Sequence, residues 1–320
     1  MESDVAALTT ATPWACPRCH SALPDGASSS SVHTFPLRIP GRLVHGSAAL
    51  EEYASSCPEC GLPYTITHDT RFEYPYRQLL AEVDPRKFLR WSAAQNNGYI
   101  SYALMRGSSC SIEGREDVVR FADFIRDNVT SSPRTCLDLG CGPLARPSYL
   151  PSMPDAQLIG IDPFDSEWDG NFVLGAGEFL PLGDASVDLA VAATALDHTL
   201  DLSRTLRELA RVTREGGSLM VWDHKFEPAW KRLAGAAYGL LRSPLGTKTA
   251  KIRTNLFPER VRVYDNGIVL WTPKGFADPF HEPRSRRPSW QAKLGRALEK
   301  VGFVQAATDP TRGFSHYVRS

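Results

Sequence analysis

The stretch CLDLGCGP, residues 136–143, decides the fold. It is an apolar run with one acid, Asp138, that leads into a corner built on Gly140 and Gly142. A strand that ends in Gly-x-Gly lets the backbone turn sharply and lets a ligand approach the backbone amides. The stretch IGIDP, residues 159–163, ends on a second acid, Asp162. Because an acid at this position can accept both hydroxyls of a ribose, the two stretches predict a site for a nucleoside-like ligand.

Strand and helix patterns alternate around this corner. Short apolar strands are predicted at TCLDLG, AQLIGID, SVDLAVAA and GSLMVWD. Helical spacing of apolar residues runs through EGREDVVRFADFIRDNV and LSRTLRELARV, and again through WQAKLGRALEK. Apolar strands separated by helices predict an α/β protein with a parallel sheet and right-handed crossovers. Near the end of the chain, Asn266-Gly267 between β-rich flanks predicts a hairpin over 261–271.

The spacing of the glycines distinguishes between two kinds of nucleotide ligand. A dinucleotide-binding loop has the pattern GxGxxG and holds a pyrophosphate at a helix N-terminus. Here the run is GCGPLARP, which lacks the third glycine. An acid ahead of the glycines also repels phosphate, whereas it suits an ammonium group. The corner therefore favours a cationic nucleoside ligand.

Four stretches together resemble the motifs of class I S-adenosylmethionine-dependent methyltransferases. They are LDLGCGP, IGIDP, GEFLPLGDASVDLAVAATALDH and LRELARVTREGGSLMVWD, in this order. The resemblance implies a Rossmann-like, mostly parallel sheet of seven strands, whose last strand enters antiparallel as part of a hairpin. It also implies S-adenosylmethionine as the cofactor.

The resemblance assigns cofactor contacts to the ends of the strands. The methionine portion would lie against Asp138, Gly140 and Gly142, the ribose at Asp162, the adenine beside Ala176, Gly177 and Glu178, and the methyl group near Thr194 to Leu196. Two departures matter. Leu144 stands where relatives often have Gly, and Ala176 stands where they often have an acid that contacts adenine; backbone groups or Glu178 could replace that acid.

Two CxxC pairs precede this region, CPRC at 16–19 and CPEC at 57–60. Four thiolates at this spacing predict a tetrahedral zinc site of Cys16, Cys19, Cys57 and Cys60. Ordinary cysteines, or a redox pair, are the alternatives. CPRCHSAL and CPECGLPYTIT resemble the small zinc-ribbon domain that activates some methyltransferases, and we expect its role here to be structural.

The chain divides into four predicted parts. Residues 1–12 are expected to be a flexible tail, 13–75 a zinc-ribbon-like module, and 76–111 a helical connector or lid. Residues 112–320 form the predicted methyltransferase domain, with a substrate-side insertion at about 225–290. Long inserted loops commonly carry specificity, and the aromatic residues of this one suggest a sizeable acceptor.

Proton removal from the acceptor needs a base near the methyl group. His198, at the end of a predicted strand, and His281, in the insertion, are the candidates, with Asp197 a lesser one. Each histidine could equally have a structural role.

Composition limits the acceptor. Lys plus Arg and Asp plus Glu each number 36, so no net charge favours RNA. We expect a small-molecule acceptor of small or medium size, such as a sugar, a lipid-linked compound or a secondary metabolite. An rRNA or tRNA methyltransferase and a catalytically inactive binding scaffold are the alternatives. Because no signal peptide or membrane span is predicted, and because the cysteines are spaced as metal ligands and not as a disulfide framework, we expect a cytoplasmic protein. The oligomeric state is left open.

Overall fold

The computed structural model of the chain describes 14–24, 32–39, 42–51, 55–67, 70–92, 94–95, 115–129, 132–143, 149–150, 153, 155–223, 260–263, 269–272 and 290–320. The tail 1–12, Leu144, His281, the hairpin turn at 266–267 and most of the insertion at about 225–290 lie outside these residues.

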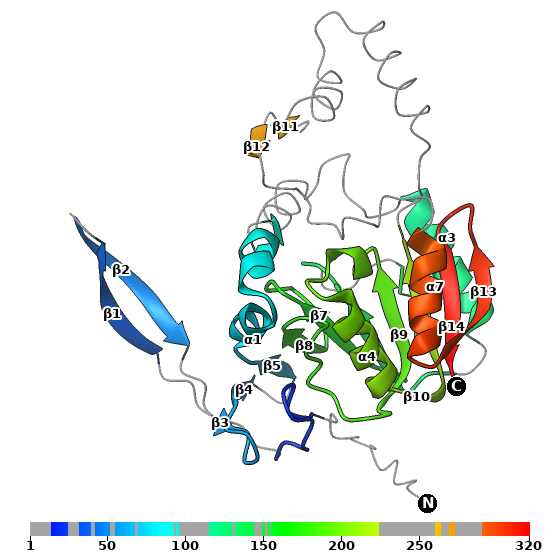
Figure 1. The fold of residues 1–320 in the computed structure, drawn as a ribbon, viewed down its shortest axis with the longest axis horizontal. Coiled ribbons are helices and arrows are strands. Elements are labelled where there is room, and N and C mark those ends of the chain that lie inside the picture. Colours follow the sequence, from blue (N-terminus) through cyan, green and yellow to red (C-terminus); the bar gives the residue numbers. More distant parts are fainter. Residues whose placement is uncertain are drawn as a thin grey trace, which may run out of the picture.

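One ten-stranded sheet forms the frame of the molecule (Figure 1). Its spatial order is β13-β14-β10-β9-β6-β7-β8-β5-β4-β3. The bounds are β3 Ser55–Ser56, β4 Pro63–Thr67, β5 Arg71–Glu73, β6 Thr135–Leu139, β7 Gln157–Asp162, β8 Asn171–Leu174, β9 Val187–Ala193, β10 Thr213–Trp222, β13 Phe303–Asp309 and β14 Phe314–Arg319.

The centre of the sheet is parallel, as predicted. Strands β8, β7, β6, β9 and β10 all pair in parallel, and β14 joins β10 in the antiparallel sense as the second strand of a hairpin with β13. The carboxyl ends of the five parallel strands therefore meet at one edge, where ligands of open α/β sheets bind.

The predicted number of strands, seven, is wrong. Seven strands run from β13 to β8, and three more from the N-terminal region continue the sheet beyond β8. Strand β5 pairs in parallel with β8, with Arg71 opposite Phe172 and Glu73 opposite Leu174. Strands β4 and β3 then add in the antiparallel sense. An edge strand offers unpaired backbone groups, and the N-terminal strands satisfy those of β8.

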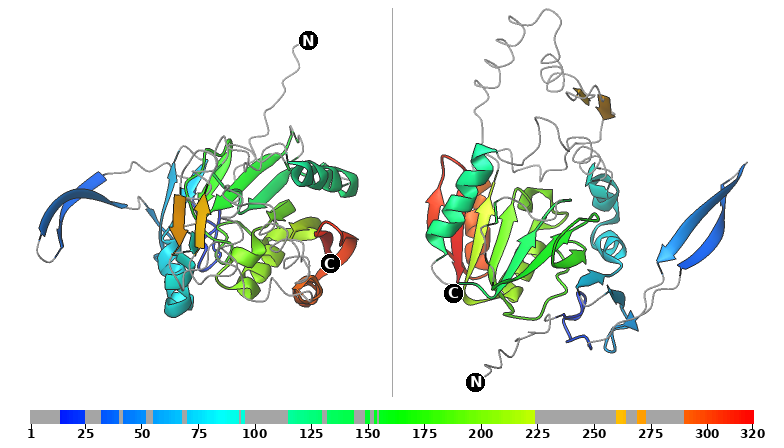
Figure 2. Two further views of the ribbon diagram at one scale, coloured as in Figure 1. Left: turned by 90° about the horizontal axis from the view of Figure 1, so that it is seen from above. Right: turned by 180° about the vertical axis from the view of Figure 1, so that it is seen from behind.

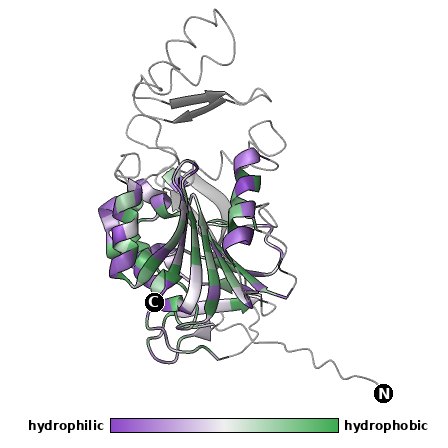
Figure 3. Ribbon diagram, turned by 90° about the vertical axis from the view of Figure 1, so that its right-hand side faces the viewer, coloured by the Kyte–Doolittle hydropathy of each residue, from purple (hydrophilic) through white to green (hydrophobic). Residues whose placement is uncertain are grey.

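Helices cover both faces of the sheet (Figures 1 and 2). On one face α3, Glu116–Asn128, buries Val118, Phe121 and Ile125 against alternate residues of the central strands. On the other face α4, Leu202–Val212, and α7, Trp290–Lys300, pack on the remaining strand residues. Apolar positions dominate the strands in Figure 3, whereas the helices carry one apolar side each.

The N-terminal residues share this core. Phe72 of β5 is fully buried, and its ring lies 5.2 Å from that of Trp14 and 5.6 Å from that of Tyr64. The amide of Ala15 donates to the carbonyl of Pro181 at 3.0 Å. The helix α1, Tyr76–Val83, follows β5 directly. The domain boundary near residue 75 stays a prediction, but the sheet is continuous across it.

Two hairpins stand outside the main sheet. Strands β1, Val32–Ile39, and β2, Arg42–Glu51, pair with each other between the two CxxC stretches, and Figure 2 shows them apart from the body. Strands β11, Arg260–Val263, and β12, Val269–Thr272, are the two arms of the predicted hairpin. Among the residues described, no helix is long and apolar enough to cross a bilayer.

Candidate functional site

The glycine corner lies at the carboxyl end of β6. Gly140 and Gly142 have φ angles of +75° and +72°, in the left-handed region that favours glycine. A Cβ on Gly140 would lie 2.7 Å from the Cβ of Ala195, whereas a Cβ on Gly142 would meet no atom within 4 Å. The amide of Gly140 donates to the carbonyl of Ile161 at 2.8 Å. The corner is therefore tied to β7 while its second glycine faces open space.

Two acids, one fully buried and one partly buried, flank this corner. Asp138 is fully buried, and the hydroxyl of Tyr149 donates to its Oδ2 at 2.9 Å. Burial raises the pKa of Asp138 to about 8; the Tyr149 hydrogen bond lowers it in part, and the charge of Asp162 adds to the rise. Sequence reasoning missed Tyr149, which follows the corner closely along the chain.

Asp162, at the end of β7, accepts the amides of Gly142 and Phe164, each at 3.0 Å. Burial raises its pKa to about 6, against the lowering effect of those two amides. Carboxylates held in low dielectric gain strongly from a positive or hydrogen-bonding ligand. The two acids thus suit a ligand with an ammonium group and hydroxyls.

The turn after β8 forms the next wall. The amide of Gly175 donates to the carbonyl of Asp162 at 2.9 Å, so this turn is joined to the end of β7. A Cβ on Gly177 would come within 2.9 Å of both Leu139 and Thr205, so no larger residue fits there. Ala176 is buried, with 5% of its surface exposed.

Glu178 holds the start of a helix. Its Oε1 accepts the amides of Leu200 and Asp201, at 2.6 and 3.0 Å, directly ahead of α4. Burial raises the pKa of Glu178, and these amide hydrogen bonds oppose the rise. The carboxylate therefore connects the turn after β8 to α4.

Thr194 closes β9 in an unusual conformation. Its φ angle is +55°, which is rare and costly for a β-branched residue. Its amide donates to the carbonyl of Trp222 at 2.7 Å, which ties it to the end of β10. Backbone strain of this kind concentrates at functional sites.

The short 3-10 helix Leu196–His198 follows at once and brings Asp197 beside His198. The Nε2 of His198 lies 3.6 Å from the Oδ1 of Asp197, and the side chains are 23% and 5% exposed. Trp91 and Gln95 donate from their side chains to the carbonyl of His198, at 2.7 and 2.9 Å. The connector before α3 therefore fixes the backbone of this histidine. His281 lies outside the described residues.

Sequence reasoning missed a further acid at this edge. Asp223 directly follows β10 and is buried, with 4% of its surface exposed. Burial raises its pKa to about 7, the charge of Asp197 adds to the rise, and a hydrogen bond from Trp290 opposes it. An acid at the end of a buried strand was also the signal for Asp162, so GSLMVWD could have revealed it.

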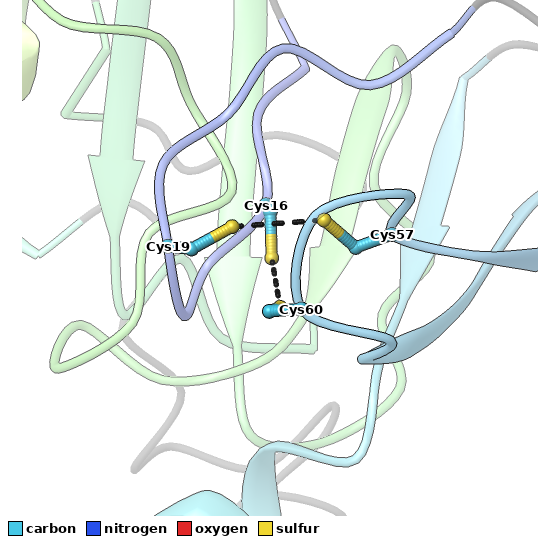
Figure 4. Close-up of side chains that lie close together, drawn as sticks. All are labelled: Cys16, Cys19, Cys57 and Cys60. Carbon is cyan, nitrogen blue, oxygen red and sulfur yellow. Dashed lines mark hydrogen bonds between the residues drawn. The ribbon is translucent and has the colours of Figure 1, made fainter.

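The four predicted metal ligands come together (Figure 4). The sulfur atoms of Cys16, Cys19, Cys57 and Cys60 all lie within 4.8 Å of one another. The Cys16–Cys60 and Cys19–Cys57 sulfur distances are 3.5 and 3.6 Å, too long for a disulfide bond. Four sulfur atoms about 2.3 Å from a common centre would be spaced in this way, so the donor set fits tetrahedral zinc.

Both CxxC stretches form the same turn. The amide of His20 donates to the carbonyl of Cys16 at 2.8 Å, and that of Gly61 donates to the carbonyl of Cys57 at 2.9 Å. His20 and Gly61 have φ angles of +64° and +70°. Burial raises the pKa of Cys57, but hydrogen bonds from Ser21 and from backbone amides outweigh burial and lower it to about 6. A thiolate is the form that binds a metal.

Residues 137–221 match the family model of a methyltransferase domain. This span begins in β6, ahead of the glycine corner, and ends in β10, so it contains both Asp138 and Asp162 as well as the strained Thr194.

Individual relatives match only part of the chain, at about one third identity. An uncharacterized methyltransferase of Mycobacterium bovis is 30% identical over 152 residues, which is 44% of this chain and 59% of the relative. The O-methyltransferase cnsE of Penicillium expansum is 34% identical over 27% of this chain and 37% of its own length. The chain thus spans about two to three fifths of the length of these relatives. Among solved structures, the Burkholderia thailandensis 1,6-didemethyltoxoflavin-N1-methyltransferase aligns at 12% identity and a TM-score of 0.43, over 72% of this chain and 89% of that one.

Proposed function

We propose that the chain is an S-adenosylmethionine-dependent methyltransferase that acts on a small or medium-sized metabolite. One observation carries the proposal. An acid and a glycine corner at the end of β6 face a second acid at the end of β7, inside the segment that matches the methyltransferase domain model. S-adenosylmethionine would supply a methyl group activated on a sulfonium.

The chain's own residues would divide the work of binding it. Asp138 suits the ammonium of the methionine part, which would lie along Gly140 and Gly142, and Asp162 suits the ribose hydroxyls. Because Glu178 is engaged by the amides ahead of α4, we assign the adenine contacts to the backbone of 175–178.

His198 is the base we propose for the acceptor. Asp197 lies beside its Nε2 and favours the tautomer with the proton on that atom, which leaves Nδ1 to accept a proton. The hydrogen bonds from Trp91 and Gln95 to its carbonyl keep the residue at the end of β9. Asp197 is then an orienting group, in the manner of a carboxylate that positions a catalytic histidine.

The class of acceptor rests on two supports. The balance of 36 basic and 36 acidic residues gives no overall attraction to a polyanion. One relative bears the name O-methyltransferase, which favours an oxygen acceptor. Methyl transfer from labelled S-adenosylmethionine into host extract, followed by separation into RNA, protein and small molecules, tests this class. Label that appears only in RNA would contradict it.

We further propose that Cys16, Cys19, Cys57 and Cys60 hold one zinc ion. The sulfur spacing and the repeated turn support a closed, four-thiolate site, which is typical of structural zinc. Cys57 and Cys60 lie in the connection between β3 and β4, so the metal would stabilise the strands that the N-terminal region adds to the sheet. The four thiolates would fill all four coordination positions of the zinc ion, so none is left for a substrate.

Replacing Asp162 with alanine should weaken cofactor binding. Loss of hydrogen bonds from a charged group costs about 1.5–3 kcal/mol, or roughly 10- to 150-fold in affinity. Calorimetric titration with S-adenosylhomocysteine measures it. Asp169→Ala, an exposed acid close by in the chain, is the control and should bind as the unaltered protein does. Equal affinity of the two variants would remove Asp162 from the site.

Cofactor affinity should depend on pH through Asp138. In the free protein its pKa is about 8, whereas pairing with an ammonium requires the ionised form. Below pH 8 the acid must first lose its proton, so affinity should fall by up to about tenfold per pH unit as the pH decreases. Titrations with S-adenosylhomocysteine at pH 6.5, 7.5 and 8.5 measure this. An affinity that stays level, or rises, on acidification would contradict the pairing.

A further inference from the structure

We propose that Tyr74 and Tyr76 are positioning residues of the cofactor pocket, whose hydroxyls fix the backbone of the two loops on its nucleoside side. This inference rests on the proposed function, because it concerns the site assigned to S-adenosylmethionine. Neither tyrosine belongs to the segment that matches the methyltransferase domain model. Tyr74 directly follows β5, and Tyr76 is the first residue of α1.

Tyr74 holds the turn after β8. It is 2% exposed, and its hydroxyl donates to the carbonyl of Phe179 at 2.6 Å while it accepts the amide of Ala176 at 3.2 Å. A Cβ on Gly175 would lie 2.6 Å from the same hydroxyl, so the phenol is pressed directly against this backbone. One hydroxyl therefore connects both ends of the turn assigned to adenine.

Tyr76 holds the other loop. Its hydroxyl donates to the carbonyl of Pro163, the residue after Asp162. The guanidinium of Arg77 lies over the ring of Tyr76 at 5.4 Å and over that of Phe164 at 5.7 Å, which fixes the ring against the same loop. The backbone next to Asp162, the residue proposed to bind the ribose, is thus held by residues of the N-terminal region.

A hydrogen bond also joins the two loops to each other. The carbonyl of Asp162 accepts the amide of Gly175 at 2.9 Å, which joins the loop held by Tyr76 to the turn held by Tyr74. Burial raises the pKa of Tyr74 well above its usual value, so the phenol keeps its proton and can donate and accept at once. A shift of either loop would therefore displace the backbone of the other.

Both tyrosines would act through the loop backbone that their hydroxyls hold. Replacement with phenylalanine tests this role, because it removes the hydroxyl and leaves the ring in place. The ring of Tyr74 packs on Phe72 and Tyr76, with centroid distances of 5.8 and 6.1 Å, and phenylalanine would retain these contacts. What phenylalanine removes is the partner of a buried amide and a buried carbonyl. Buried polar groups without a partner are costly, so the turn should shift to find new ones.

The test compares three tyrosine-to-phenylalanine variants of the full chain. Tyr74→Phe and Tyr76→Phe remove the hydroxyls in question. Tyr64→Phe is the control, because Tyr64 is equally buried, stacks on Phe72 and lies on β4, away from both loops. We expect Tyr74→Phe and Tyr76→Phe to weaken S-adenosylhomocysteine binding by about tenfold or more in calorimetry, and Tyr64→Phe to leave it unchanged.

A second readout needs no cofactor. Amide hydrogen exchange of the free protein should become faster in 175–180 for Tyr74→Phe, and in 164–165 for Tyr76→Phe, with neither change in Tyr64→Phe. Unchanged affinity with unchanged exchange in these segments would overturn the inference. If the unaltered protein fails to bind S-adenosylhomocysteine, the proposed function falls, and the exchange of the two segments still decides whether the tyrosines position them.

Discussion

Cys57→Ser protein should contain no zinc and should unfold at a temperature about 10 °C or more below that of the unaltered chain. A structural zinc ion contributes about 10 kcal/mol or more of folding free energy, and each kcal/mol lost lowers the midpoint by roughly 1.5 °C in a chain of 320 residues. The loss of stability should extend beyond the metal site, because β5 continues the main sheet and Phe72 lies in its core.

Metal analysis and thermal unfolding of protein purified without chelator measure this effect. Cys136→Ala is the matched control, because Cys136 is also buried but lies on β6, outside the cluster. It should keep about one zinc per chain. Zinc absent from the unaltered protein, or fully retained in Cys57→Ser, would remove the proposed metal site.

His198→Ala should lower turnover by about 10²- to 10⁴-fold, the range for loss of a general base, while the affinity for S-adenosylhomocysteine stays the same. Turnover is measured with the acceptor that labelling in extract identifies. The base must be neutral to accept a proton, so turnover of the unaltered enzyme should fall on acidification. Added imidazole should restore part of the activity of the variant, since a small base can occupy the space left by the ring.

Asp197→Asn separates orientation from proton transfer. The amide keeps the size of the side chain but loses the charge beside Nε2, so we expect a smaller loss of turnover than in His198→Ala. If His198 has only a structural role, its replacement should lower stability and leave turnover nearly unchanged. Reduced thermal stability with near-normal turnover and no response to imidazole would exclude His198 as the base.

The parts of the fold that sequence predicted are those set by local pattern. The periodicity of EGREDVVRFADFIRDNV gave α3, because every third or fourth residue must face the sheet. The Gly-x-Gly corner followed from the turn that Gly140 and Gly142 make possible. The CxxC spacing likewise predicted the sulfur cluster, because two such turns bring four thiols together when they meet.

The parts it missed depend on pairing between distant segments. Strand β5 has three residues and β8 has four, too few for a clear alternation, and each is defined by the other. The seven-strand expectation failed for this reason, since nothing in RFE alone shows that it extends the sheet. The role of Glu178 was hidden in the same way, because its amide partners at Leu200 and Asp201 come from a later loop.

Binding of S-adenosylmethionine at the edge formed by β6 and β7 is tested most directly by calorimetric titration of the full chain with S-adenosylhomocysteine. We expect one site per chain, with affinity weakened about tenfold or more in Asp162→Ala and retained in Asp169→Ala. Folded protein that gives no heat of binding and no thermal stabilisation at millimolar ligand would contradict it.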